Sequence, residues 1–349
     1  MKRLLLFIVF AVAVAFAAMS VGVMSNAQDK DNALAPARAP GDAPGEALGG
    51  TAVDTAWTVA WDDHLHSGAR IPFAPPLPQD IPEGEFGEMV RDGMQAFMFP
   101  ALYAQDFVGN EMACTNCHLD AGRRAGAAPM WGAYPVYPKY RGKNKQVNTM
   151  EMRVQGCFRY SMNGTPPPAD GELMKAYLAY FSWLSQGAPI GAKLEGAGFY
   201  TLPDPAETPD IGRGAAVYAA YCVACHGEDG AGLRHTDTVG WVFPPLWGPE
   251  SYNWGAGMHV PAKAAAYIKK NMPFGLQNLL SDQQAWDVAL YINSHERPQD
   301  PRFTGDIAET RARFHAQDYN LYGTEVEGAV LGANAYPSGR AGFGAAVDE

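Results

Sequence analysis

Two copies of the pattern Cys-x-x-Cys-His constrain this chain more than any other feature of its sequence. The first copy occupies residues 114–118 and the second residues 222–226. In this pattern two thiols form thioether bonds to a porphyrin and the adjacent histidine ligates its iron, so each copy is an attachment site for a c-type haem. We therefore expect two covalently bound haem c groups. The attachment residues are Cys114, Cys117 and His118 for the first haem and Cys222, Cys225 and His226 for the second.

The residues around the two motifs follow the same order twice. An expected helix runs into the motif, a loop rich in Gly and Pro follows, and a ligand-bearing segment and a closing helix complete the unit. The motifs are 108 residues apart, a suitable size for consecutive small domains. We therefore predict a mostly α fold with two tandem class-I cytochrome-c-like domains, at residues 83–190 and 209–297, joined by a linker at 191–208. Residues 28–82 are expected to form a flexible linker and an arm: residues 28–52 have no apolar period, and the aromatic, proline-rich residues 57–82 are expected to pack over the first domain. Residues 298–349 also lack an apolar period and are expected to form an irregular, extended tail.

Apolar spacing and capping residues predict where the helices lie. The first helix is expected to end before Pro100 and to bury one face, formed by Phe86, Met89, Val90, Met94 and Phe97. Further helices are expected at about residues 149–163, 169–186, 210–221, 262–270 and 281–295.

The N-terminus predicts export from the cytoplasm. A basic start, Met-Lys-Arg, precedes an uncharged apolar run of 20 residues at positions 4–23, and residues 25–27 fit a signal cleavage site. The run exceeds the usual apolar region of a signal peptide, about 7–15 residues, and nearly suffices to cross a bilayer. Residues 1–27 are therefore expected to be either a cleaved signal peptide or a membrane anchor. Both place the protein in the periplasm.

The overall charge limits the partners of this protein. The formal net charge is -11, which argues against nucleic acid as a partner. A small anion would therefore need a local basic pocket on an acidic protein.

Cys157 is the one cysteine outside the two motifs. A buried free cysteine is most often an inert small hydrophobe, but this one lies 39 residues after His118, much as Met272 lies 46 residues after His226. Met272 stands before a proline and the last helix, where a distal methionine ligand is expected. Cys157 is therefore the expected distal ligand of the first haem. Met162, five residues further on, is the competing ligand.

Cations accompany Cys157 in the sequence. On a helix, Arg153 and Ser161 would share its face because each is four residues away. Arg141 and Lys143 lie in the preceding loop. Arginines often only solvate a surface or pair with haem propionates, so both that role and a role in a substrate pocket stay open.

These residues resemble the dihaem thiosulfate dehydrogenases, which couple thiosulfate to tetrathionate. The resemblance covers about residues 83–297 and rests on the two haem motifs, on residues 153–164 (Arg-x-x-x-Cys-Phe-x-x-Ser-Met-Asn-Gly) and on residues 271–273 (Asn-Met-Pro). It implies that Cys157 is the axial ligand of the active-site haem. It also implies that Arg153 and Ser161 line the substrate pocket, with a second cation from Lys143 or Arg141.

The resemblance implies an oxidoreductase that joins two thiosulfate ions into tetrathionate and releases two electrons, or runs the reverse reaction. A cationic pocket would bring two dianions together against their repulsion, and Cys157 is implied to carry a sulfur adduct. The second haem would pass electrons to a small periplasmic carrier such as a cytochrome c.

Two alternatives remain open. The first, from a different class, is a non-catalytic dihaem electron carrier with Met162 or Cys157 as a passive ligand. The second is a cytochrome that loads thiosulfate onto a carrier protein, and the Met-ligated second domain argues against it.

Overall fold

A computed structural model describes residues 70–190 and 192–339 of this chain. The expected signal peptide or anchor at residues 1–27 and most of the arm at 28–82 lie outside the described residues. None of the helices in the described part has the length and the hydropathy that a membrane crossing requires.

The described chain is mostly helical, as predicted, with only short strands. The α-helices are α2 (Glu85–Met98), α3 (Pro100–Tyr103), α4 (Leu119–Gly122), α5 (Met150–Tyr160), α6 (Glu172–Leu184), α7 (Ile211–Tyr221), α8 (Val223–His226), α9 (Pro261–Asn271), α10 (Asp282–Ile292) and α11 (Ile307–Phe314). The strands pair in twos: β1 (Arg70–Ile71) with β4 (Lys193–Leu194), β2 (Lys139–Arg141) with β3 (Gln146–Asn148), β5 (Leu233–Arg234) with β6 (Trp241–Phe243), and β7 (Glu325–Val326) with β8 (Ala329–Val330). The first pair is parallel and the others are antiparallel.

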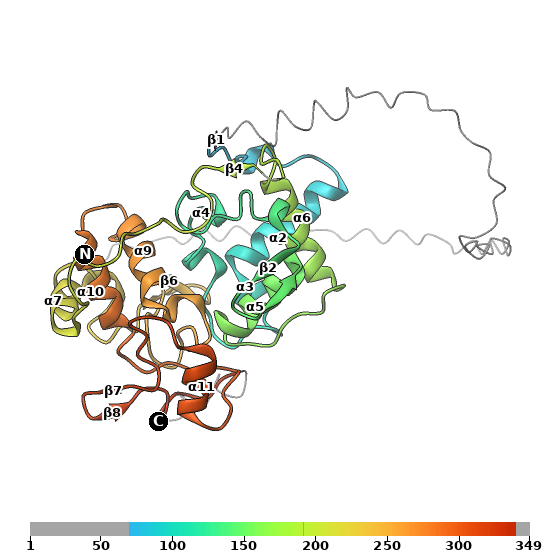
Figure 1. Cartoon of the computed structure of the whole chain (residues 1–349). Helices are drawn as coiled ribbons and strands as arrows, with labels where there is room; N and C mark the ends of the chain where they lie inside the picture. The colour runs from blue at the N-terminus through green and yellow to red at the C-terminus, as the bar shows by residue number, and fades with distance from the viewer. Residues whose placement is uncertain (1–69, 191, 340–349) are drawn as a thin grey trace, which may run out of the picture. The chain divides into compact units, whose positions relative to one another are not determined.

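Helices α2 and α6 lie side by side in the first domain (Figure 1). Their backbones approach closely at Gly93, which has no side chain. A Cβ at this position would lie only 2.0 Å from the carbonyl oxygen of Ala176. This contact turns Val90 and Phe97 into the core but leaves Phe86 and Met89 exposed, at 50% and 37%. The prediction that Phe86 and Met89 are buried was therefore wrong, because the glycine face decides which side of α2 packs.

The second domain is built from α7, α9 and α10, which pack against one another. Both α7 and α10 begin where the sequence predicted. The carboxylate of Asp210 accepts from the backbone N of Arg213 (2.7 Å), and Ser281 forms a capping box with Gln284. Such caps satisfy backbone N–H groups that have no partner inside the helix. The core includes Tyr218, Trp286 and several alanines.

Polar side chains join the two domains. The amide of Asn253 donates to the carbonyl oxygen of Arg159 (2.9 Å), and the amide of Asn271 donates to that of Gly126 (3.3 Å). Asn253 and Asn271 are both fully buried. The contact between the domains is therefore specified by hydrogen bonds that a shifted packing would leave unmade.

Residues 298–339 are more ordered than the irregular tail that the sequence predicted. They form α11 and the β7–β8 pair (Figure 1). Tyr322 and Leu331 pack with Trp254 of the second domain, and their exposed fractions are 0%, 4% and 0%. The apolar residues of this segment come from turns and a short helix, so they show no period along the sequence.

Candidate active site

The first haem motif is followed by a loop that orients its histidine. Nδ1 of His118 lies 2.6 Å from the carbonyl oxygen of Ala128. Since a carbonyl only accepts hydrogen bonds, Nδ1 carries the proton and the lone pair of Nε2 is left for a metal. The ring is therefore held in the tautomer that an iron ligand needs.

The second motif reaches the same arrangement with a different loop. Helix α7 ends next to Cys222, and α8 carries the rest of the motif. Nδ1 of His226 lies 2.9 Å from the carbonyl oxygen of Pro244. Its Nε2 is therefore also left for a metal.

Arg297 is a buried arginine that has no acidic partner within the described part of the chain, and this also fits a haem. Arg297 is 0% exposed, and its guanidinium lies 4.4 Å from the ring centre of Tyr252. Tyr252 interacts electrostatically with Cys117, so this cation lies near the first motif. In residues 70–190 and 192–339, Nε and Nη1 of Arg297 have no hydrogen-bond partner. A buried charge is costly unless an opposite charge pairs with it, and haem carboxylates would supply that charge.

Helix α5 holds Arg153 and Cys157 on one face, as predicted. Thr149 caps the helix by accepting from the backbone N of Met152 (3.3 Å). Nη1 of Arg153 donates to Sγ of Cys157 over 2.7 Å, and Cys157 also interacts with the ring of His118. Burial raises the pKa of the Cys157 thiol, and the guanidinium of Arg153 is the strongest influence that lowers it. The guanidinium of Arg153 therefore favours a thiolate at Cys157, close to the first haem motif.

The two candidate methionine ligands lie in different surroundings. Met162 is 2% exposed and belongs to the core of the first domain. Met272 directly follows α9 and packs against the cluster that also contacts Cys222. The side chain of its neighbour Asn271 is engaged by the carbonyl oxygens of Gly126 and Tyr267. Met272 also packs against a small cluster of Leu119, Ala127 and Tyr267, so it lies where the two domains meet.

A cavity of about 250 Å³ lies beside α5. Four cations line it, namely Arg141, Lys143, Arg153 and Arg302, and no acidic residue of the described chain does. Arg141 ends β2 and donates from Nη1 to the hydroxyl of Tyr137 (2.9 Å). Such a lining favours a small anion with more than one charge.

Lys143 reaches the cavity from an exposed turn between β2 and β3. Although the residue as a whole is exposed, its Nζ donates to the carbonyl oxygen of Gly255 (2.5 Å) and lies 4.1 Å from the ring centre of Tyr160. Burial of this ammonium, followed by repulsion from Arg302 and Arg153, lowers the pKa of Lys143 to about 7. Its charge is therefore sensitive to pH near neutrality.

The structure brings most of the expected site residues together, with two differences. Arg141, Lys143 and Arg153 all line the cavity, whereas Ser161 stands at the C-cap of α5 and is not part of the lining formed by the described residues. Cys157 is likewise outside the lining formed by the described residues, but it contacts Arg153, and its neighbour Gly156 lines the cavity.

Tyr160 and Arg302 are cavity residues that the sequence did not predict. Tyr160 lies three residues after Cys157 on α5, and this spacing could have placed it on the same side. Arg302 comes from the segment that was expected to be a tail, where no local pattern pointed to a site.

Comparison with known proteins agrees with the two-domain structure. Residues 100–190 match the cytochrome c domain described as SoxA/TsdA. Residues 209–292 match the family described as cytochrome C oxidase, cbb3-type, subunit III. Both matched regions contain one Cys-x-x-Cys-His motif.

Curated relatives extend over both domains. One from Stutzerimonas stutzeri, described as thiosulfate dehydrogenase, is 53% identical over 262 residues, which are 74% of this chain and 85% of the relative. Another with the same description, from Thiomonas intermedia, is 49% identical over 78% of this chain and 86% of its own length. This chain belongs to the thiosulfate dehydrogenase family. The resemblance inferred from the motifs is thereby confirmed, and this is a family of oxidoreductases.

A solved thiosulfate dehydrogenase, TsdBA from Marichromatium purpuratum in its as-isolated form, has a similar fold. It is 51% identical, with a TM-score of 0.72 over 75% of this chain and 57% of that chain. This chain therefore spans less than two thirds of that protein. The predicted fold of two cytochrome c domains is confirmed. Arg302 lies outside both matched regions, residues 100–190 and 209–292.

Proposed function

We propose that this protein interconverts thiosulfate and tetrathionate in the periplasm, with Cys157 and Met272 as the distal ligands of two covalently bound haems. In the oxidative direction two thiosulfate ions form one tetrathionate ion and two electrons leave. The observation that carries the proposal is the 2.7 Å contact from Arg153 to Cys157 beside a cavity with four cations. Curated relatives described as thiosulfate dehydrogenases support it.

The protein's own contribution is to hold two dianions side by side. Two unit charges 4 Å apart repel by about 4 kcal/mol near a protein surface, and each thiosulfate carries two charges. The cavity cations offset this repulsion, and a fixed orientation of the two ions makes their reaction effectively unimolecular. Haem c, when bound, supplies one-electron redox chemistry.

The second domain is proposed to pass electrons onward. Met272 stands where a distal ligand would raise the haem potential, and a small periplasmic carrier such as a cytochrome c would accept the electrons. Export of the chain is proposed from residues 1–27, whether they are cleaved or kept as a membrane anchor through residues 4–23.

The alternative is a non-catalytic electron carrier with Met162 as the ligand. A passive carrier has no use for a cavity lined by four cations and no acid. Membership of an oxidoreductase family also speaks against it.

Two variants of the purified holoprotein test the proposal. Thiosulfate-dependent reduction is followed at the haem bands, and tetrathionate is measured as the product. Cys157→Gly keeps all four thioether cysteines, so it should retain both haems and lose nearly all turnover. Met162→Leu is the matched control because it removes the competing ligand with little change in volume, and it should remain active. Full activity in Cys157→Gly would refute the proposal.

A further inference from the structure

We infer that Arg302, supplied by the C-terminal segment, is a further anion-binding residue of the cavity, and that Asp300 positions it. This inference rests on the proposed function and adds to it a residue beyond the two matched cytochrome domains. Arg302 lines the cavity together with Arg141, Lys143 and Arg153. The first domain supplies the other three cations.

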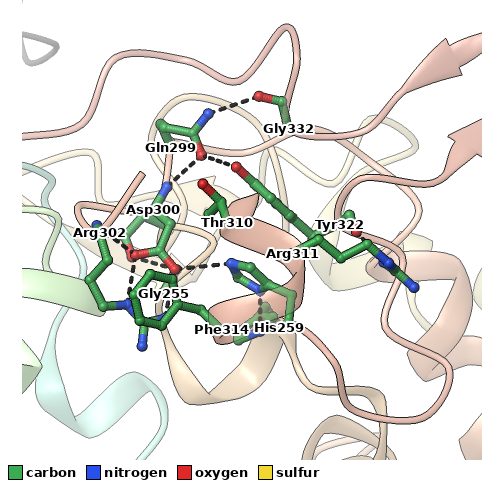
Figure 2. A network of polar contacts seen from close by, with 12 residues as sticks. Gly255, His259, Gln299, Asp300, Arg302, Thr310, Arg311, Phe314, Tyr322 and Gly332 are labelled. Atoms are coloured by element: carbon green, nitrogen blue, oxygen red, sulfur yellow. Dashed lines mark hydrogen bonds and ion pairs between the residues drawn. The ribbon is translucent and has the colours of Figure 1, made fainter. Parts of the chain in front are cut away.

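One edge of the Arg302 guanidinium binds Asp300, and the rest of the group is left for a ligand. Its Nε donates to Oδ1 of Asp300 (2.9 Å) and its Nη2 lies 2.6 Å from Oδ2 of the same carboxylate (Figure 2). This paired contact uses one edge of the guanidinium and fixes its plane. Among the residues that the structure describes, Nη1 has no hydrogen-bond partner. The two N–H groups of Nη1 and the second N–H of Nη2 are therefore the donors that remain for an anion in the cavity.

Asp300 is itself held from several sides. It is 1% exposed, and its backbone N donates to Oε1 of Gln299 (2.8 Å). Oδ2 lies 3.0 Å from Nε2 of His315, and Nδ1 of His315 lies 3.0 Å from Nε2 of His259. The ring of His315 also stacks on Tyr322, with 4.1 Å between ring centres. The carboxylate that orients Arg302 thus belongs to a buried network rather than to a mobile loop (Figure 2).

Aromatic rings keep Arg302 next to the other cations. Its Cζ lies 4.2 Å from the ring centre of Phe314 and 5.2 Å from that of Tyr160. Nζ of Lys143 lies 4.1 Å from the ring centre of the same Tyr160. Tyr160 thus contacts a cation from each of two distant parts of the chain, and its ring stabilises both.

The charge count of the proposed substrates fits this arrangement. Two thiosulfate dianions bring four negative charges into one cavity, so each further cationic donor lowers their repulsion. Arg302 shares its charge with Asp300, but its plane is fixed by that contact, and a fixed donor binds an anion with less ordering cost than a free side chain would. The ligand class is therefore a pair of small sulfur oxoanions.

Arg302→Gln and Arg302→Lys test the role of Arg302 in the full holoprotein. Arg159→Gln is the matched control because Arg159 is an exposed arginine next to Tyr160 that does not line the cavity. For Arg302→Gln we expect kcat/KM for thiosulfate to fall about tenfold or more, the scale of a lost hydrogen bond to a charged group. Lysine keeps the charge but cannot form the paired contact, so it should recover part of the loss. Arg159→Gln should stay within about twofold of the parent, as surface changes usually do.

Sulfate binding measured by calorimetry gives a second readout that needs no turnover. The sulfate dissociation constant should rise in Arg302→Gln and stay unchanged in Arg159→Gln. The inference is overturned if the two variants match in both measurements. A parent protein that binds sulfate but does not oxidise thiosulfate would instead refute the proposed function and leave the anion site intact.

A double-mutant cycle tests the positioning role of Asp300. If Asp300 acts through Arg302, Asp300→Asn should raise KM for thiosulfate, and Arg302→Gln with Asp300→Asn should be no worse than Arg302→Gln alone. Two results would show that Asp300 has a structural role instead. One is that the two substitutions have additive effects on thiosulfate kinetics, and the other is that Asp300→Asn lowers the thermal unfolding temperature without changing KM.

Discussion

Lys143 carries a charge that the cavity itself destabilises. Its ammonium is packed between Gly255 and Tyr160, and burial followed by repulsion from other cations lowers its pKa to about 7. The charged groups that act on it are Arg302, Arg153, Asp300 and Lys263. A bound dianion favours the protonated form, so affinity for an anion is full below the pKa and falls as the pH rises through it.

We therefore predict that KM for thiosulfate rises above about pH 7. The rise should reach at most about tenfold per pH unit, the limit for one ionisation. Lys143→Arg keeps a permanent charge, so its KM should stay level over the same range. The measurement is KM against pH for both proteins at constant ionic strength. A level profile in the parent, or an equal rise in Lys143→Arg, would contradict this role of Lys143.

Arg153 lies between the cavity and the thiol of Cys157, so its loss should affect substrate more than folding. Arg153→Gln removes a cation from a partly desolvated site, which costs about 2–5 kcal/mol by the scale of truncated charge pairs. We expect kcat/KM to fall accordingly while haem content stays the same. Arg159→Gln, on the exposed face of the same helix, is the control. Equal kinetics in the two variants would place Arg153 outside the binding site.

At the scale of elements, the loop that follows Asn253 must pass close to α5. A Cβ on Gly255 would lie 2.5 Å from the ring of Tyr160 and 3.0 Å from Oδ1 of Asp300. Gly257, two residues on, has no atom within 4 Å of the corresponding position. The two glycines therefore offer a matched pair.

Gly255→Ala should destabilise the protein by about 1–3 kcal/mol, the usual cost of overpacking, and should also raise KM because Tyr160 and Asp300 must move. Gly257→Ala should be close to neutral in both respects. Thermal unfolding and thiosulfate kinetics of the two variants check this expectation. If Gly255→Ala is as stable and as active as Gly257→Ala, the close packing of this loop against α5 is not required.

Local signals were sufficient for the elements that carry the first-domain part of the site. Thr149 caps α5 where the sequence predicted it, and the spacing of four residues places Arg153 against Cys157. Asp210 and Ser281 likewise begin α7 and α10. Each of these features depends only on residues within one or two helical turns, so each can be predicted from the sequence of this chain alone.

The missed features depend on contacts between distant residues. Phe86 and Met89 fit an apolar stripe, but Gly93 admits the backbone of α6 and turns that stripe partly outward. Arg302 enters the site through Asp300, whose partner His315 contacts His259 from the second domain. Neither fact leaves a periodic pattern in the sequence, so neither could be predicted from it.

Across the whole molecule, the charge of the cavity is opposite in sign to the net charge of the protein. The formal net charge is -11, yet the cavity gathers four cations and no acid from the described chain. The first domain and the C-terminal segment both supply these cations, and the loop at Gly255 in the second domain contacts Lys143. The site is therefore complete only when the first domain, the loop at Gly255 and the C-terminal segment are folded against one another.

The two domains should differ in their redox role although each carries one haem attachment motif. Each domain has one Cys-x-x-Cys-His motif, and Nδ1 of each motif histidine contacts a carbonyl oxygen, which leaves Nε2 for iron. A pyridine haemochrome assay should therefore find two haems per chain. Met272→Ala should keep both haems attached. It should lower the potential of one haem by on the order of 100 mV, within the roughly 0.8 V range that axial ligands span.

Met272→Ala should also slow electron delivery to a cytochrome c acceptor without changing thiosulfate binding, because Met272 lies in the second domain. Met89→Ala, on the partly exposed face of α2, is the control and should leave both potentials unchanged. A redox titration followed at the haem bands distinguishes the variants. If Met272→Ala has the two potentials of the parent, Met272 does not bind the second iron, and another residue must raise the potential of that haem.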